Sequence, residues 1–307
     1  MTRRRPGVLA ALLSAAVAAS VLSACTPTAD DRPLVVVSTN ILGDVVSELA
    51  GDDVEVMTLM RPDADPHSFE ISAQDAARLR AADLLVSNGL GLEEGLQQHL
   101  DAAAAEGVDR FVAGESIDVL DYATGDAAGT PDPHFWTDPA RMIDVVEALG
   151  PRLSELPGVE GAVVDAHVDA YLAELRQLDD DMSAAFETIP APRRALVTNH
   201  HVFGYLSDRF GFRVVGAAIP GGTTLAAPSA SDLADLVSAI EENDVAAVFA
   251  ESSSPDRLMH ALAQETDLHV DVIELYTESL TAEGGGAEDY LNMMRENTQR
   301  IVTGLAQ

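Results

Sequence analysis

Short apolar runs alternate with longer amphipathic segments through the first half of the chain. The run 34–40 is rich in β-branched residues, which is typical of a strand buried in a parallel sheet. We predict further strands over 54–60, 83–88 and 110–113, with helices over 41–50, 73–82 and 93–106 between them. This alternation predicts a parallel sheet with right-handed crossovers.

The second half repeats this rhythm after a long helical stretch. Strands are predicted over 195–198, 212–218, 245–250 and 269–275, and helices over 200–210, 231–243, 255–266 and 287–305. Between the halves, a helix opens at Asp138 or Pro139 and runs to Leu149. Apolar residues then recur at helical spacing over 159–188, which makes a helix roughly 40 Å long. Pro190 and Pro192 end that helix because proline cannot continue it.

The predicted fold is therefore α/β, with two similar lobes of mainly parallel sheet joined by one long backbone helix. We place the N-terminal lobe at 33–150, the linking helix at 151–190 and the C-terminal lobe at 191–307. Open α/β sheets bind ligands beyond the carboxyl ends of their strands. We therefore expect the ligand site in the cleft between the lobes.

The N-terminus has the features of an export signal. Three arginines at 3–5 precede the apolar stretch 8–21, which is short for a membrane span. Leu22-Ser23-Ala24-Cys25 then resembles the bacterial lipobox, in which the cysteine is acylated. We predict a signal peptide at 1–24, a tether at 25–32 and a lipid anchor, such as palmitate, that holds the protein to the outer side of the cell membrane. The alternative is an ordinary secretory peptide with an incidental cysteine.

Length and charge narrow the classes of function. At 307 residues, the chain is long enough for two lobes with ample cores. Its formal charge of −33 argues against binding to nucleic acid, which requires basic patches. Cys25 is the only cysteine, so no disulfide can form within the chain.

Two proline-stiffened turns present a histidine. Asp65-Pro66-His67 and Asp132-Pro133-His134 are each followed within two residues by an aromatic side chain. Proline fixes φ and pushes the preceding residue toward extended geometry. A ligand held on a rigid turn suits metal binding, because its geometry is set before the ion arrives.

Three histidines share one topological position. His67, His134 and His200 each lie at or just beyond the end of a predicted strand, so they can converge on the cleft. Zinc prefers neutral imidazole, and three histidines with one carboxylate would complete a tetrahedron. Glu278, after the last strand, and Glu251, after the strand before it, both qualify as the fourth ligand. His201 is the alternative to His200 if the register shifts by one residue.

Other polar residues admit two interpretations. Asp65 and Asp132 either orient imidazoles as acceptors outside the metal's own ligands or stabilise turns. Glu251 either binds the ion itself or, like these aspartates, supports a ligand from outside. The remaining histidines lie on predicted helices or a strand without such a loop, and we interpret them as structural: His99, His167, His260 and His269.

Taken together, these motifs resemble the solute-binding lipoproteins of bacterial zinc and manganese ABC transporters, a family that includes the streptococcal metal-binding adhesins. The resemblance covers nearly the whole chain after the signal. The segments that carry it are 66–70, 132–139, 200–206, 250–251 and 290–297, which read PHSFE, DPHFWTDP, HHVFGYL, AE and YLNMMREN.

The resemblance implies a metal-ion receptor that delivers its ion to a membrane permease and acts as a monomer. By matched position its ligands are His67, His134 and His200. The fourth family ligand is usually an aspartate, and this chain has Glu278 there. The histidine-rich loop of many zinc-specific members is absent from 117–132. Three imidazoles favour Zn²⁺ over the harder Mn²⁺.

Three other functions stay open from the sequence. One is a Mn²⁺ receptor of the same family. Another is a secreted zinc hydrolase, in which three histidines hold the ion and Glu251 or Glu278 acts as general base. The chain has no His-Glu-x-x-His motif, which disfavours that enzyme. The third is a surface adhesin with an incidental ion.

Overall fold

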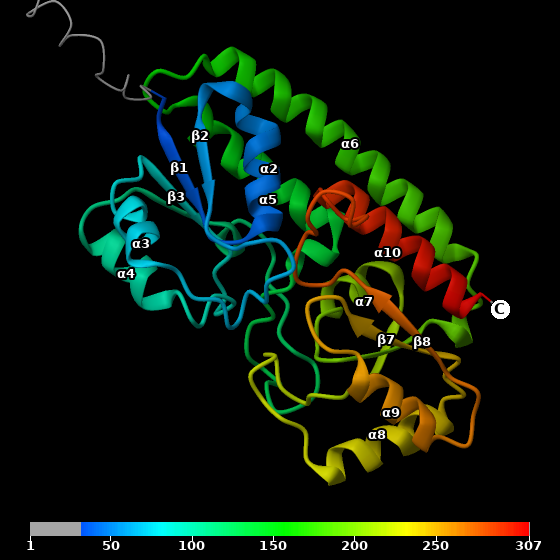
Figure 1. The fold of residues 1–307 in the computed structure, drawn as a ribbon. Coiled ribbons are helices and arrows are strands. Elements are labelled where there is room, and N and C mark those ends of the chain that lie inside the picture. The colour runs from blue at the N-terminus through cyan, green and yellow to red at the C-terminus, as the bar shows by residue number, and fades with distance from the viewer. Residues whose placement is uncertain (1–31, 307) are drawn as a thin grey trace, which may run out of the picture. The chain divides into compact units, whose positions relative to one another are not determined.

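Two four-stranded parallel sheets organise the chain, as Figure 1 shows in a computed structural model that describes residues 32–306. The predicted signal peptide, Cys25 and nearly all of the tether lie outside the described residues. Among residues 32–306, no helix combines the length and apolar character needed to span a bilayer.

The first sheet has the strand order β2-β1-β3-β4. Its strands are β1 (Leu34–Val37), β2 (Glu55–Thr58), β3 (Leu84–Ser87) and β4 (Arg110–Val112), and its connecting helices are α2 (Asn40–Ala50), α3 (Ala73–Leu79) and α4 (Gln97–Ala105). Every strand pair is parallel, as predicted. Ser72 caps α3 through a reciprocal pair of bonds with Asp75, and Gly51 ends α2 with a positive φ of 57°.

The second sheet has the order β6-β5-β7-β8, which repeats the topology of the first. Its strands are β5 (Ala195–Thr198), β6 (Arg213–Ala217), β7 (Ala247–Glu251) and β8 (Asp271–Leu275), and its helices are α7 (Gly204–Phe210), α8 (Ala230–Glu242), α9 (Arg257–Glu265) and α10 (Tyr290–Leu305). The helix predicted over 200–210 begins only at Gly204, because His200 and His201 lie in the turn after β5.

Two helices lie between the sheets in sequence, α5 (Pro139–Ser154) and α6 (Gly161–Glu187). The predicted end of α5 at Leu149 is wrong, because the helix continues through Pro151 to Ser154. Pro151 lacks the N–H that would bond the turn before it, and only three helical residues follow it in α5. The 27-residue α6 contacts α2 and α5 at one end of its path and α10 along the other (Figure 1).

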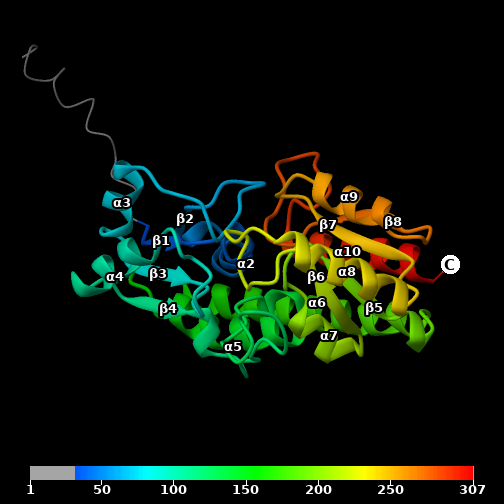
Figure 2. The same ribbon diagram turned by 90° about the horizontal axis from the view of Figure 1, so that it is seen from below.

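Each sheet has one face on a core shared by both lobes. Val35 and Val37 of β1 belong to that shared core, whereas Val36 points to a separate cluster with α3 and α4. In the second sheet Phe249 faces the shared core and Val248 faces the cluster under α8 and α9. Successive side chains on a strand point to opposite faces, so strands covered on both sides are apolar throughout. Figure 2 shows the two lobes side by side.

Candidate metal centre

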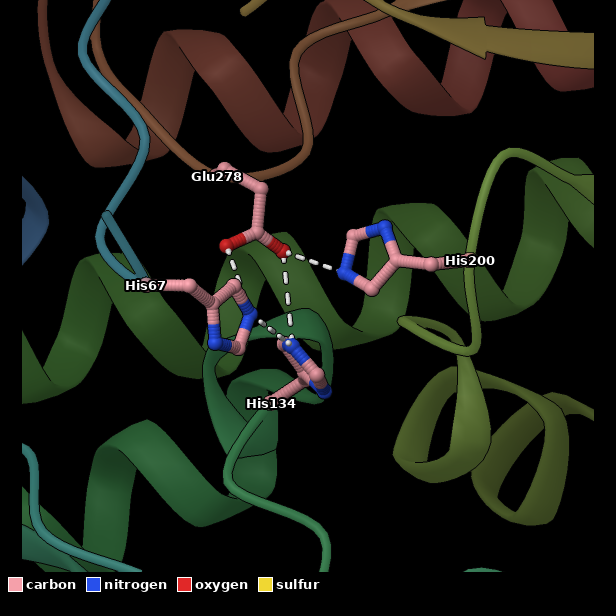
Figure 3. Close-up of side chains that lie close together, drawn as sticks. All are labelled: His67, His134, His200 and Glu278. Atoms are coloured by element: carbon pink, nitrogen blue, oxygen red, sulfur yellow. Dashed lines mark hydrogen bonds and ion pairs between the residues drawn. The ribbon is translucent and has the colours of Figure 1, made fainter. Parts of the chain in front are cut away.

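His67, His134, His200 and Glu278 come together between the two sheets. Each offers one ligand atom, and these four atoms lie within 4.8 Å of one another. At most 1% of each residue is exposed to solvent. Figure 3 shows the three imidazoles arriving from separate segments and the Glu278 carboxylate facing all three. Among residues 32–306, this is the only such group of histidine, cysteine and acidic side chains.

The same nitrogen of each imidazole faces the carboxylate. Nε2 of His200 lies 3.2 Å and Nε2 of His134 lies 3.4 Å from Glu278 Oε1, while Nε2 of His67 lies 3.7 Å from Oε2. The Nε2 atoms of His67 and His134 are 3.4 Å apart. A tetrahedral zinc site with bonds of about 2.0–2.1 Å has ligand–ligand edges of about 3.3 Å. These four distances are close to that edge, although the ligand atoms as a group spread over as much as 4.8 Å.

Two matching turns position His67 and His134. The main-chain N–H of His67 donates to Asp65 Oδ1 at 2.8 Å, and that of His134 donates to Asp132 Oδ1 at 3.0 Å. In both turns the aspartate bonds the backbone two residues on, as a turn-stabilising aspartate does. The first turn links β2 to α3, and the second precedes α5.

The outward nitrogen of His134 has two buried partners. Its Nδ1 lies 2.8 Å from Asp132 Oδ1 and 3.2 Å from the Tyr122 hydroxyl. Burial lowers the pKa of His134 well below 6.5, so this imidazole is neutral and able to bind metal. Burial also raises the pKa of Asp132 to about 7, although the His134 main-chain N–H opposes the shift.

The outward nitrogen of His200 pairs with Glu251. Its Nδ1 lies 2.9 Å from Glu251 Oε2, and both side chains are buried. Burial alone would lower the pKa of His200, but the carboxylates of Glu251 and Glu278 outweigh it and raise the pKa to about 10. A proton on His200 therefore neutralises part of the acidic site before a metal ion displaces it.

His67 differs from the other two imidazoles. Among the described residues, Asp65 makes no hydrogen bond to its ring: Oδ1 accepts from the His67 main-chain N–H, and the second oxygen accepts from Ser68 Oγ at 3.0 Å and Thr224 Oγ1 at 2.6 Å. The carboxylate facing His67 Nδ1 is Glu94, at 3.8 Å, and 45% of that side chain is exposed. Of the two sequence interpretations of Asp65, the structure therefore supports turn stabilisation.

The alternative ligand candidates lie at different places in the structure. Glu251 lies on the Nδ1 side of His200, outside the group of four, whereas Glu278 lies inside it. His201 is not part of the group. The side chains of His260 and His269 are 52% and 95% exposed, in agreement with their exclusion.

Sequence reasoning missed two residues that face the imidazoles, Tyr122 and Glu94. Tyr122 lies in the loop before the second Asp-Pro-His turn, and no local motif marks it. Glu94 follows the fully buried Glu93, which binds the β3 loop through the backbone of Asn88 and Gly89. These bonds fix the path of the chain around Glu93. Glu94 faces His67 only because the folded chain brings the two segments together.

Comparison with known families decides which proteins share this architecture. Residues 35–304 match the family model described as the periplasmic component A of the zinc-uptake complex. The chain belongs to this family. The match extends from β1 to the last turn of α10, so it includes both lobes and all four clustered residues. The resemblance inferred from the motifs is confirmed.

Relatives within the zinc-uptake component A family differ in the metal they are named for. The manganese-binding lipoprotein MntA of Halalkalibacterium halodurans is 30% identical over 89% of this chain and 88% of its own. The zinc-binding protein TroA of Treponema pallidum is 31% identical, with 91% of each chain covered. The solved structure of TroA superposes with a TM-score of 0.81 over 90% of this chain and 100% of that one. The family therefore binds metal ions for ABC transporters, and its members differ in the ion.

Proposed function

We propose that this chain is a Zn²⁺ receptor that holds one ion between its lobes and delivers it to an ABC-type permease. His67, His134 and His200 bind through Nε2, and Glu278 supplies the fourth ligand. The observation that carries this proposal is the convergence of three buried Nε2 atoms on one buried carboxylate, each within 3.7 Å of one of its oxygens. Burial of four polar ligands in one place would be costly without an ion to satisfy them.

The choice of zinc rests on the chemistry of the donors. Three imidazole nitrogens and one carboxylate match the ligands and coordination number that zinc prefers. Manganese is a harder ion that favours oxygen ligands and more of them. Although the relatives MntA and TroA are named for different metals, the site here is rich in nitrogen and has four groups.

A receptor function is favoured over a hydrolase by the place of Glu278. A catalytic zinc keeps an open position for water, with three protein ligands. Here the carboxylate of Glu278 lies where that water would bind, 3.2–3.7 Å from the three Nε2 atoms. Four protein ligands suit storage and release of the ion rather than activation of water.

The lobes and the anchor complete the proposal. We assign capture to the lobes 33–150 and 191–307, joined by 151–190, and anchoring to acylated Cys25 after removal of the signal 1–24. An anchored monomer on the outer side of the membrane can meet its permease by diffusion within the membrane plane. MntA, a relative of similar length, is named a lipoprotein.

The test is a metal titration of the purified protein with Zn²⁺ and Mn²⁺ in competition. We expect one Zn²⁺ per chain, bound more tightly than Mn²⁺. His200→Ala should abolish tight binding, and the matched control His269→Ala, which removes an exposed imidazole, should leave it unchanged.

Three results would change the proposal. Tighter binding of Mn²⁺ would overturn the choice of ion, and absence of stoichiometric metal would overturn the receptor site. If Glu278→Gln bound Zn²⁺ as tightly as the unaltered protein, the ion would have only three protein ligands. The hydrolase alternative would then be favoured over a closed receptor site.

A further inference from the structure

Glu278 belongs to the C-terminal lobe by sequence but is attached to the N-terminal lobe by its contacts. The segment 277–280 follows β8 and precedes α10. Apart from the Glu278 carboxylate, the hydrogen bonds that this segment makes to other described residues all go to Asn40, Asp63 or Trp136. These three residues lie in the N-terminal lobe, near the start of α2, before the first Asp-Pro-His turn and just after His134.

Asn40 is the centre of this attachment. Its Nδ2 donates to Ser279 Oγ at 2.7 Å and to the main-chain oxygen of Leu280 at 3.3 Å. Its Oδ1 accepts from the Leu280 N–H at 3.0 Å. One amide side chain therefore binds both the donor and the acceptor of Leu280, as a neighbouring strand would. Asn40 is 8% exposed, so water competes little for these bonds.

Two further bonds fix the same segment from the same side. The Trp136 indole N–H donates to the main-chain oxygen of Thr277 at 2.8 Å, and the Asp63 N–H donates to that of Leu280 at 3.0 Å. Glu278 is thus held on both flanks by the lobe that carries His67 and His134. Trp136 is two residues after His134, so one rigid turn positions a ligand and the flank of another.

Tyr276, just before this segment, is attached to the C-terminal lobe instead. The Tyr276 N–H donates to Asn297 Oδ1 at 2.9 Å, and Asn297 Nδ2 donates to the Tyr276 main-chain oxygen at 2.7 Å. Asn297 lies on α10, which packs on β8. The change of attachment therefore falls between Tyr276 and Thr277.

His200 is the ligand that stays with the C-terminal lobe. Its main-chain oxygen accepts from Thr198 Oγ1 at 2.6 Å, and its ring pairs with Glu251 at the end of β7. Because of the attachment of 277–280, the ligands divide three to one between the lobes. A displacement of one lobe against the other would separate His200 from three ligands that move together.

From these contacts we infer that Asn40 is a positioning residue for the metal site, which holds Glu278 on the N-terminal lobe so that His200 alone closes the site from the other. This inference rests on the proposed metal-receptor function and adds to it a residue that touches no ion. A positioning residue acts on affinity through the ligand it holds, typically by roughly 10- to 100-fold.

The experiment compares Asn40→Ala with Asn297→Ala in the full chain. Both substitutions remove a buried amide that bonds the main chain within four residues of Glu278. Of these two amides, only that of Asn40 links the segment to the other lobe. We expect Asn40→Ala to weaken Zn²⁺ binding by roughly 10- to 100-fold, and Asn297→Ala to weaken it much less. Thermal unfolding without metal reports whether each variant folds.

Two further measurements separate positioning from general loss of structure. Combined with Glu278→Gln, Asn40→Ala should cause no additional loss of affinity, because its effect passes through Glu278. The visible spectrum of bound Co²⁺ should change in Asn40→Ala in the same direction as in Glu278→Gln. If Asn40→Ala does not fold, Ser279→Ala removes the 2.7 Å bond alone and should weaken binding in the same direction.

The outcomes distinguish this inference from the proposed function. If the unaltered protein binds no metal, the receptor function itself fails. If it binds Zn²⁺ but Asn40→Ala binds equally well, the positioning role fails and the receptor stands. Equal losses in Asn40→Ala and Asn297→Ala, or fully additive losses with Glu278→Gln, would also overturn the positioning role.

Discussion

The two Asp-Pro-His turns have the same local structure and different surroundings. In both, the aspartate Oδ1 accepts from the histidine main-chain N–H, at 2.8 Å in the first turn and 3.0 Å in the second. In the second turn the same oxygen also lies 2.8 Å from the His134 ring. In the first, the other Asp65 oxygen accepts from Ser68 and Thr224, and the carboxylate facing His67 Nδ1 is the half-exposed Glu94 at 3.8 Å.

This difference shows how tertiary packing adds function to a repeated motif. The tripeptide is sufficient to place an imidazole, because proline and aspartate set the turn locally. Whether a carboxylate also supports the ring depends on what packs around the turn. Of these two clustered imidazoles, that of His134 is therefore held firmly and that of His67 loosely.

The largest effect is expected from removing either imidazole. His67→Ala and His134→Ala should each weaken Zn²⁺ binding by more than roughly 100-fold, because a direct ligand is lost. That is the upper end of the range typical of residues that only support a ligand. His134→Ala should be the more damaging, since it also leaves the buried Asp132 without its ring partner. Equilibrium competition with a chelator measures both. A larger loss in His67→Ala would reverse the contrast.

The aspartates provide the next comparison. Asp132→Asn should weaken Zn²⁺ binding about 10-fold, because a neutral amide supports the His134 ring less well than a carboxylate. Asp65→Asn should have little effect, since asparagine can still accept from the His67 N–H and stabilise the turn. The same titration checks both variants. Equal losses would mean that Asp65 supports its imidazole in the bound state too.

The pH dependence locates the proton that zinc displaces. His134 is neutral because burial lowers its pKa, whereas the pKa of His200 is raised to about 10, so the metal-free protein holds a proton there. Below that pKa, Zn²⁺ must displace the proton, and affinity should rise about tenfold per pH unit between about pH 7 and 9. Calorimetry in buffers of different ionisation enthalpy should detect about one proton released per ion. Constant affinity over this range would contradict the assignment.

The same proton affects folding of the metal-free protein. A raised pKa means that folding favours the protonated imidazole, so His200 stabilises the fold below about pH 6.5 and loses this contribution as pH rises through about 10. In His200→Ala, this part of the pH dependence should disappear from the free energy of unfolding measured in urea. An unchanged profile would place the proton elsewhere.

The smallest effect is expected at Glu94. The Glu94 side chain is 45% exposed and lies 3.8 Å from His67 Nδ1. Glu94→Gln should therefore weaken Zn²⁺ binding by less than roughly 10-fold, the lower end of the range typical of residues that support a metal ligand. Glu251→Gln, at the buried and closer pair with His200, is the matched comparison and should have the larger effect. A Glu94 effect as large as that of Glu251 would show that Glu94 closes on His67 when the ion binds.

Local sequence determined a large part of this protein. The β/α alternation predicted both sheets, because buried strands need apolar residues on both faces and amphipathic helices need them on one. The Asp-Pro-His turns and the strand end at Thr198 predicted the three histidines of the cluster, since their geometry depends on neighbours in the chain. Ser72 and Gly51 end or begin helices through bonds to residues close by in the chain.

Only the tertiary structure decided between Glu278 and Glu251. Both follow neighbouring strands of one sheet, so topology placed both near the cleft. Glu251 ends β7 and pairs with the outer nitrogen of His200, whereas the segment after β8 is drawn across to Asn40 and Trp136, which places Glu278 inside the cluster. Those bonds join residues more than 140 positions apart in the chain. Periodicity and turn chemistry report only local neighbours, so only the folded chain could show which of the two glutamates joins the three histidines.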